Sequence, residues 1–221
     1  MAERVSLAYG AAGGRVDALR EVSVELRPGT FLAIRGPSGS GKTSLLHCLG
    51  GLRIPTGGEV RWNGVPLGGL ELDARIRTRG AAFAYLFQGG NLLPTFTAEQ
   101  NLAFAAFIAR RRDGEQTGVL LDRLGLPNKA LALPDELSGG EQQRVALGRA
   151  LAQGARVLLA DEPTGQLDRA TAAVVLDLID DVRRDDPQLI VVIATHDGSV
   201  AERATRVLEI LDGRLTGEGR R

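Results

Sequence analysis

The sequence predicts an α/β fold with a mainly parallel sheet, an N-terminal antiparallel β subdomain and an inserted helical subdomain. The first observation is a set of short, apolar, β-rich runs that alternate with longer helical patterns: Phe31–Arg35, Ala82–Phe87, Val157–Ala160 and Leu189–Ala194. Near-continuous apolar strands separated by helices indicate a parallel sheet covered on both faces. The second observation is that strand signals are absent between Gln88 and about Ala155. The third is a different, alternating pattern near the N-terminus.

The N-terminal runs alternate between apolar and polar residues, which is typical of strands with one buried face. They are Val5–Tyr9, Val22–Leu26 and Glu59–Trp62, with turn signals at Pro28-Gly29 and Thr56-Gly57-Gly58. Such strands favour a small antiparallel sheet. At the other end of the chain, two runs flank Asp212-Gly213, a dipeptide typical of β-hairpins: Arg206–Leu211 and Arg214–Thr216.

The stretch without strand signals, residues 89–155, is predicted to be a helical insertion within a single domain of residues 1–221. Two capping boxes open helical patterns inside it. In each box a hydroxyl side chain precedes a glutamine or glutamate by three residues, at Thr97 with Gln100 and at Ser138 with Glu141. We therefore expect helices to begin at these two points.

Charge and composition exclude several classes of protein. The 221 residues contain 27 Lys+Arg and 27 Asp+Glu, so the formal net charge is zero, which argues against binding nucleic acid through a basic surface. The single cysteine, Cys48, excludes an internal disulfide and a zinc knuckle and suits a reducing compartment. With 43% hydrophobic residues, the chain has an ordinary globular composition.

The apolar runs are too short to cross a membrane. The longest are Leu102–Ala109 and Leu189–Ala194, whereas a spanning helix needs roughly 18 apolar residues. Residues 1–4 open no secretory segment. We therefore expect a soluble protein on the cytoplasmic side of whatever it serves.

The most specific local motif lies between the predicted strand Phe31–Arg35 and a helical run. Its residues match G-x-x-x-x-G-K-[ST] in full: Gly36, Pro37, Ser38, Gly39, Ser40, Gly41, Lys42 and Thr43. The glycines let successive backbone N–H groups point at phosphate oxygens, and the following helix adds its positive end. We expect Lys42 to reach the β and γ phosphates and the Thr43 hydroxyl to bind Mg²⁺. These eight residues are called the phosphate loop below.

Two acids follow the predicted strand Val157–Ala160. Ligands bind at the carboxyl ends of strands in sheets of this kind. Asp161 is therefore placed to hold Mg²⁺, and Glu162 to take a proton from an attacking water. The alternative is that the two acids only begin a solvated loop.

A third segment, Leu137 to Gln142, begins a helix with two glycines. Gly139 and Gly140 are poor helix formers. They make sense if exposed N–H groups of the first turn approach a phosphate closely. The alternative is an ordinary helix start capped by Ser138.

These motifs, in this order and followed by His196 after a buried run, resemble the ATP-binding subunit of an ABC transporter. The resemblance covers nearly the whole chain, and it implies the ABC ATPase fold. It also implies that the phosphate loop and Ser44 bind ATP, and that Tyr9 stacks on the adenine. Gln88 would contact Mg²⁺ and the attacking water, and His196 would bond the γ-phosphate and steady Glu162.

The resemblance further implies a pair of chains around two ATP molecules. Ser138, Gly139 and Gly140 would meet the ATP held by the other protomer, and Asp168 would cross the dimer interface. Two simpler interpretations remain open, a surface strand tyrosine for Tyr9 and a turn histidine for His196. His47 and Cys48 are assigned to packing rather than to a metal site, because they lack ligand spacing.

Two longer segments, Phe87–Pro94 and Leu159–Gly165, resemble the subgroup that serves lipoprotein release, macrolide or antimicrobial-peptide export, and cell division. The chain departs from that subgroup in having Gln166 where asparagine is typical and Gln100 where glutamate is common. The resemblance to this subgroup implies an ATPase that powers a separate permease. Binding to that permease would hold the ATPase at the inner face of the membrane.

An apolar group close to Gln88 suggests where the permease docks: Leu92, Leu93, Pro94 and Phe96. Two other classes of protein are alternatives to this interpretation. A relative acting on DNA or ribosomes would carry coiled-coil insertions or two nucleotide-binding modules, and a basic surface. A small kinase or GTPase with a phosphate loop would not explain Leu137–Gln142.

Overall fold

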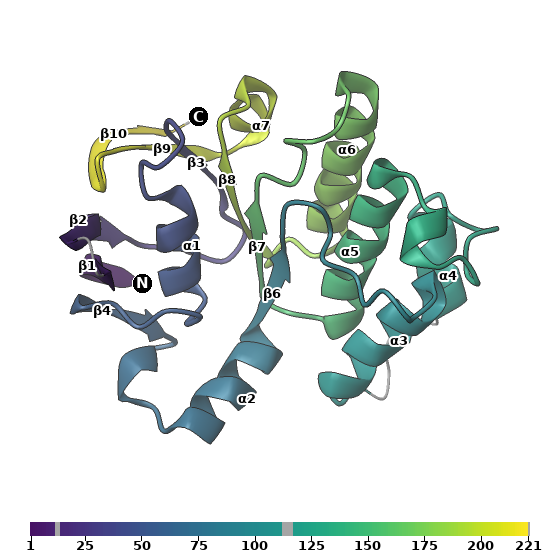
Figure 1. Ribbon diagram of the computed structural model, residues 1–221, viewed down its shortest axis with the longest axis horizontal. Coiled ribbons are helices and arrows are strands. Elements are labelled where there is room, and N and C mark those ends of the chain that lie inside the picture. The colour runs from purple at the N-terminus through teal and green to yellow at the C-terminus, as the bar shows by residue number, and fades with distance from the viewer. Residues whose placement is uncertain (12–13, 112–116, 221) are drawn as a thin grey trace. The chain divides into compact units, whose positions relative to one another are not determined.

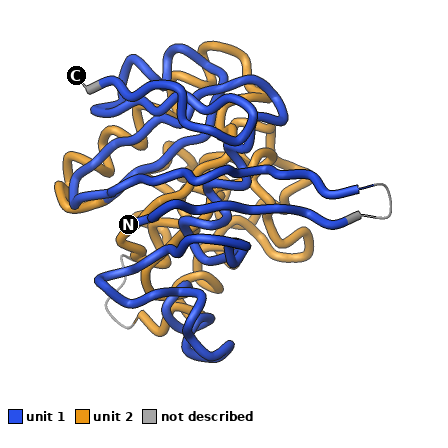
Figure 2. Tube along the Cα trace, turned by 90° about the vertical axis from the view of Figure 1, so that its left-hand side faces the viewer, with its two compact units in different colours: residues 1–79, 190–221 blue, residues 80–189 orange. Residues whose placement is uncertain are grey.

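The computed structural model describes residues 1–11, 14–111 and 117–220. The chain divides into two compact units, shown in different colours in Figure 2. Unit 1 contains Met1–Arg79 and Ile190–Arg221, and unit 2 contains Gly80–Leu189. Helix α2 (Leu72–Ala82) contains the boundary between them. Among the described residues, no helix is both long and apolar enough to cross a membrane.

Unit 1 contains the predicted antiparallel sheet, with strand order β2-β1-β4-β5. Its strands are β1 (Ala2–Ala11), β2 (Gly14–Val24), β4 (Gly57–Trp62) and β5 (Val65–Pro66), and the short 3₁₀ helix η1 (Leu67–Gly69) follows. β1 and β2 form a long hairpin that extends to one side in Figure 2. Val22 and Val24 of β2 are buried while Ser23 between them is exposed. This alternation confirms the expected one-sided sheet.

The second sheet of unit 1 is mainly parallel. Its strands are β3 (Phe31–Arg35), β8 (Ile190–Thr195), β9 (Arg206–Leu211) and β10 (Arg214–Arg220). β3 lies between β8 and β9 and is parallel to both, while β10 returns antiparallel to β9. Helices α1 (Lys42–Leu49) and α7 (Gly198–Arg203) accompany the sheet (Figure 1). The predicted strands and the C-terminal hairpin are confirmed.

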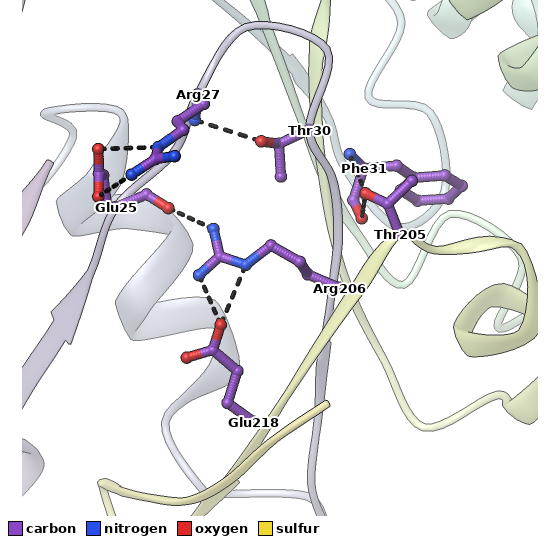
Figure 3. A network of polar contacts seen from close by, with 7 residues as sticks. All are labelled: Glu25, Arg27, Thr30, Phe31, Thr205, Arg206 and Glu218. Atoms are coloured by element: carbon purple, nitrogen blue, oxygen red, sulfur yellow. Dashed lines mark hydrogen bonds and ion pairs between the residues drawn. The ribbon is translucent and has the colours of Figure 1, made fainter. Parts of the chain in front are cut away.

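A polar network ties the chain end to the start of β3 (Figure 3). Arg206 on β9 donates to the Glu218 carboxylate of β10 and to the backbone oxygen of Glu25. The Thr205 hydroxyl accepts from the N–H of Phe31 and donates to its carbonyl. Only 16% of the Arg206 side chain is exposed, so this ion pair is shielded more than an ordinary surface pair. The network therefore fixes the outer strands against β3.

Unit 2 contains two parallel strands and a set of helices. Strands β6 (Phe83–Leu86) and β7 (Val157–Asp161) pair from Phe83–Val157 to Leu86–Ala160. The helices are α3 (Ala98–Ile108), α4 (Thr117–Arg123), η2 (Pro134–Glu136), α5 (Gly139–Gln153) and α6 (Arg169–Asp185). Between β6 and β7 the described residues contain no strand, as the sequence predicts. Both predicted capping boxes are present, at the starts of α3 and α5.

Candidate functional site

The phosphate loop joins β3 to α1, and its turns leave no room for side chains at two glycines. A Cβ on Gly36 would lie 2.2 Å from the carbonyl oxygen of Ile210, and a Cβ on Gly41 would lie 2.4 Å from that of Ala18. Gly41 also has φ 108°, a conformation that favours glycine. Glycine is therefore required at both positions by the backbone that packs against the loop.

Two side chains of the loop are buried, those of Ser40 and Lys42. Lys42 is buried, and its Nζ donates to the carbonyls of Gly36 and Pro37, each at 2.9 Å. Ser40 is also buried, and among the described residues its Oγ has no hydrogen-bond partner. An unpaired buried hydroxyl costs free energy, so its place here fits a ligand that supplies an acceptor. A phosphate oxygen has that chemistry.

His196 leaves the sheet of unit 1 beside the phosphate loop. Strands β3 and β8 are parallel, and Arg35 pairs with Thr195, so the next residues, Gly36 and His196, follow at the same edge. Gly36, Pro37 and His196 line one cavity of about 400 Å³. The imidazole is exposed. The structure therefore brings together these two sequence-predicted features.

Tyr9 lies near the end of β1 with 37% of its surface exposed. Its Oη is 3.3 Å from the Oγ of Ser44, the residue that follows the phosphate loop. The guanidinium of Arg53 lies over the phenol ring, with Cζ 5.8 Å from the ring centroid. The sequence predicted Tyr9 and Ser44 as neighbours of the nucleotide. It gave no signal for Arg53, because the contact joins segments that are far apart in the chain.

The two acids end strand β7 in unit 2, as predicted. Asp161 is the last residue of the strand, and both carboxylate side chains belong to half-buried residues. Glu162 has φ 45°, in the left-handed region that non-glycine residues rarely adopt. Its carbonyl accepts from the N–H of Gly165 at 3.1 Å. Asn91, Arg110 and Asp212 share this conformation, so it leaves both interpretations of the two acids open.

Gln88 is exposed in the turn after β6, and helix α5 holds the backbone on either side of it. Gln143 donates to the carbonyl of Phe87 at 3.4 Å, and Arg149 donates to the carbonyl of Asn91 at 2.6 Å. Burial lowers the pKa of the Arg149 guanidinium. The sequence did not predict these contacts. They couple the segment that carries Gln88 to the helix that begins after Ser138.

Asn101 holds the next part of the same loop. It is fully buried in α3, and its side chain accepts from the N–H of Leu93 and donates to the carbonyls of Leu93, Phe96 and Thr97. The only signal in the sequence is a polar residue at the start of the apolar run Leu102–Ala109. Because every polar atom of the side chain is paired, Asn101 fixes the shape of the loop.

The predicted docking group is less exposed than its sequence suggests. Leu92, Leu93 and Phe96 are half-buried and only Pro94 is exposed. The ring of Phe96 meets Phe104 of α3 edge to face, with centroids 5.5 Å apart. Two residues farther along α3 are more exposed, Phe107 at 76% and Ile108 at 60%. The apolar surface of this region therefore extends along α3.

Helix α5 begins as predicted, with Ser138 as its N-cap. The Ser138 Oγ accepts from the N–H of Glu141, and the Glu141 carboxylate accepts from the N–H of Ser138 at 2.8 Å. This backbone hydrogen bond is the main cause that lowers the pKa of Glu141, with a smaller contribution from Lys129. Ser138 and Gly139 are exposed.

Gly140, in contrast, is buried, which differs from the expectation of two exposed glycines. A Cβ at this position would lie 2.1 Å from the Cγ2 of Thr171 on α6. The close approach of α6 therefore explains why position 140 is glycine. Gly139 is not confined in this way and remains exposed to solvent. The nearest atom to a Cβ at Gly139 is the Cδ2 of Leu167 at 3.7 Å, an ordinary contact.

This difference gives a prediction about stability. Gly140→Ala is expected to lower the free energy of unfolding by about 1–3 kcal/mol, because the new methyl group overlaps the Thr171 methyl group. Thr171→Ser in the same chain removes that methyl and keeps the hydroxyl that donates to Asp168, so it should restore most of the loss. Urea unfolding measures both variants. Gly139→Ala is the matched control, and equal effects at the two glycines would contradict the packing account.

Asp168 caps α6. Its carboxylate accepts from the N–H groups of Ala170 and Thr171 and from the Thr171 hydroxyl, at 3.0, 3.1 and 2.6 Å. The bond from the Thr171 hydroxyl is the main cause that lowers the pKa of Asp168. Asp168 is also exposed. The cap accounts for an aspartate at this position within one chain.

Cys48 is buried in α1, and burial raises the pKa of its thiol to about 11. A thiol with that pKa is unreactive at neutral pH.

Among the residues that the structure describes, no three or more His, Cys, Asp or Glu side chains form a group that could hold a metal ion. A Mg²⁺ ion held by Thr43, Gln88 and Asp161 would also need phosphate oxygens among its ligands, as is usual for that ion.

The chain is similar to known proteins over nearly its whole length. A family model described as "ABC transporter" matches residues 19–165. Two solved structures of MJ0796, described as a bacterial ABC transporter cassette, are 32% identical to the chain with a TM-score of 0.90. Each comparison covers 99% of this chain and 97% of the other. Both structures are dimeric, and one is a post-hydrolysis state bound to ADP and Pi.

Proposed function

Because the chain belongs to the ABC transporter family, we propose that it is an ATPase that pairs with a second copy of itself and powers a separate membrane permease. The observation that carries the proposal is the phosphate loop: two glycines with no room for a side chain, the Lys42 ammonium inside the loop, and the unpaired Ser40 hydroxyl. Among common ligands, the phosphates of a nucleotide supply the matching acceptors.

The proposed chemistry assigns a role to each acidic and polar residue of the site. Thr43, Gln88 and Asp161 would hold Mg²⁺, which when bound neutralises charge on the phosphates. Glu162 would take the proton of the attacking water. His196 would donate to the γ-phosphate and hold the Glu162 carboxylate in place. His196 lines the same cavity as the phosphate loop, which supports the first of its two roles.

Pairing of two chains would complete each site. Ser138 and Gly139 are exposed at the start of α5, where unpaired N–H groups and the helix dipole favour an anion. In the proposed dimer, these residues and Gly140 bind the ATP held by the other protomer, and Asp168 lies at the interface. The dimeric MJ0796 structures support this assembly by their similarity over nearly the whole chain.

Adenine recognition tests the proposal at Tyr9. A base stacked on an aromatic ring gains about 1–3 kcal/mol, so Tyr9→Ala should weaken ATP affinity roughly 5- to 150-fold. Tyr9→Phe keeps the ring and loses only the contact between Oη and Ser44, so it should bind nearly as well as the native chain. Isothermal titration calorimetry measures both constants. Equal affinities for the alanine and phenylalanine variants would remove Tyr9 from the base site.

Permease docking is proposed at Leu92, Leu93, Pro94 and Phe96, on the loop that Asn101 and Arg149 hold. Export, lipoprotein release and a division-type system are the candidate tasks, and the protein would then lie on the inner face of the membrane. Leu93→Glu should reduce capture of the permease at least tenfold, because it places a charge in a half-buried apolar contact. ATP binding should be retained.

Co-purification of a membrane protein with the chain, identified by mass spectrometry, measures the docking. Val174→Glu is the control, because Val174 is 45% exposed on α6 and belongs neither to the proposed group nor to α3. If Leu93→Glu and native chains capture the permease equally, the docking group is wrong.

A further inference from the structure

We infer that Arg53 is a positioning residue for the purine base, forming the outer layer of a stack of guanidinium, phenol ring and base. The inference rests on the proposed binding of ATP. Its starting observation is the Arg53 guanidinium over the ring of Tyr9, with Cζ 5.8 Å from the centroid. That separation lies within the range of a cation–π contact. Tyr9 is thus held at two points, at its face by Arg53 and at its Oη by Ser44.

Arg53 and the phosphate loop lie at opposite ends of helix α1, and Tyr9 contacts both Arg53 and Ser44, the residue after the loop. The backbone N–H of Arg53 donates to the carbonyl of His47 at 3.0 Å, so Arg53 is fixed near the C-terminal end of α1. The phosphate loop lies at the opposite, N-terminal end of the same helix. A base linked to phosphates in that loop reaches Tyr9 from the loop side. In the proposed stack, Arg53 occupies one face of the ring and the base takes the other.

Two physical effects should strengthen the binding of the base in this arrangement. A ring already held at its face and its hydroxyl loses less side-chain freedom when a ligand stacks on it. The cation also draws π electron density toward its own face, and an electron-poor ring stacks more favourably on an electron-rich purine. Both effects act through Tyr9. The contribution of Arg53 should therefore depend on the base and vanish when the ring is absent.

A double-mutant cycle tests the stack. Dissociation constants for Mg²⁺-ATP and for inorganic triphosphate with Mg²⁺ are measured for the native chain, Arg53→Ala, Tyr9→Ala and the double variant. Arg53→Ala should weaken ATP affinity about two- to fivefold, the size of an exposed cation–π contact. It should leave triphosphate affinity unchanged. In the Tyr9→Ala background, removing Arg53 should have no effect on ATP.

Arg53→Lys and Arg53→Met provide the matched controls. Lysine keeps the cation and should recover part of the affinity, whereas methionine keeps much of the chain length and should resemble alanine. An equal loss for ATP and triphosphate, or an equal loss with and without Tyr9, would show a general charge effect and overturn the inference. A gain in ATP affinity for Arg53→Ala would mean that Arg53 and the base compete for one face, which also overturns it. A native chain that binds neither ligand would instead refute the proposed function.

Discussion

Lys42→Ala is expected to weaken ATP binding at least 100-fold. The Lys42 ammonium is buried inside the phosphate loop, where it donates to the carbonyls of Gly36 and Pro37. Charge-assisted hydrogen bonds to phosphate oxygens contribute about 1.5–3 kcal/mol each, and the alanine variant makes none. Titration with a fluorescent ATP analogue measures the loss. An affinity within fivefold of the native value would refute the role of the loop.

Two controls separate lost binding from lost folding. The thermal midpoint of the nucleotide-free Lys42→Ala chain reports whether the two carbonyls left without a donor destabilise the loop. Lys42→Arg keeps a positive charge, but a planar guanidinium does not reproduce the compact ammonium inside the loop. We therefore expect the arginine variant to bind ATP far more weakly than the native chain while it remains folded.

The strands of the parallel sheet could be predicted because buried parallel strands are apolar along their whole length. β3 begins and ends at the predicted residues, and β8 is displaced by one residue from its prediction. The hairpin of β1 and β2 is longer than predicted. Arg15 and Asp17 pair with each other on exposed surface there, so an apolar pattern is absent from the outer part of β2.

Helix α6 is absent from the expected elements, although the sequence carries signals for it. Asp168 is a standard N-cap, and buried residues recur at helical spacing after it: Ala172, Val175, Leu176, Ile179 and Val182. The resemblance implies an interface role for Asp168, and its N-cap hydrogen bonds also account for an aspartate there within one chain.

Motifs within one loop could be predicted as candidate site residues, whereas contacts between distant segments could not. The phosphate loop and the two acids lie at strand ends, where the α/β pattern places ligands. Asn101, Arg149 and Arg53 act on backbone or rings that lie far away in the sequence or in an irregular loop. Neither the periodicity of apolar residues nor the spacing of a motif indicates such contacts. The burial of Gly140 depends likewise on the path of α6.

Glu162→Gln is expected to slow ATP hydrolysis by roughly 10²- to 10⁴-fold, the usual contribution of a positioned proton acceptor. The amide cannot take a proton, yet it nearly preserves the size of the side chain. Its backbone conformation, with φ 45°, is unaffected by the exchange of an oxygen for an NH₂ group. Phosphate release at saturating ATP measures the rate. A rate within tenfold of the native value would assign the proton to another group.

The Glu162→Gln variant should also make the ATP-bound dimer detectable. If ATP joins the two protomers and hydrolysis separates them, Glu162→Gln with ATP and Mg²⁺ should elute from a sizing column as a dimer. The chain that carries both Lys42→Ala and Glu162→Gln should remain monomeric, because it holds ATP poorly. A Glu162→Gln chain that stays monomeric at saturating ATP would contradict assembly around the nucleotide.

Ser138→Arg added to Glu162→Gln tests whether the start of α5 contributes to that dimer. Ser138 is exposed and its Oγ already caps the helix, so a long side chain there should block a partner's ATP while each chain still binds its own. We expect a monomer with nearly unchanged nucleotide affinity. Asp135→Arg is the matched control, because it places the same side chain on the exposed surface of η2, before the cap. Because losing the cap costs about 0.5–2 kcal/mol, Ser138→Ala measures that effect alone. If Ser138→Arg still dimerises with ATP, this helix start does not meet the other protomer's nucleotide, and the exposed Gly139 must serve a different purpose.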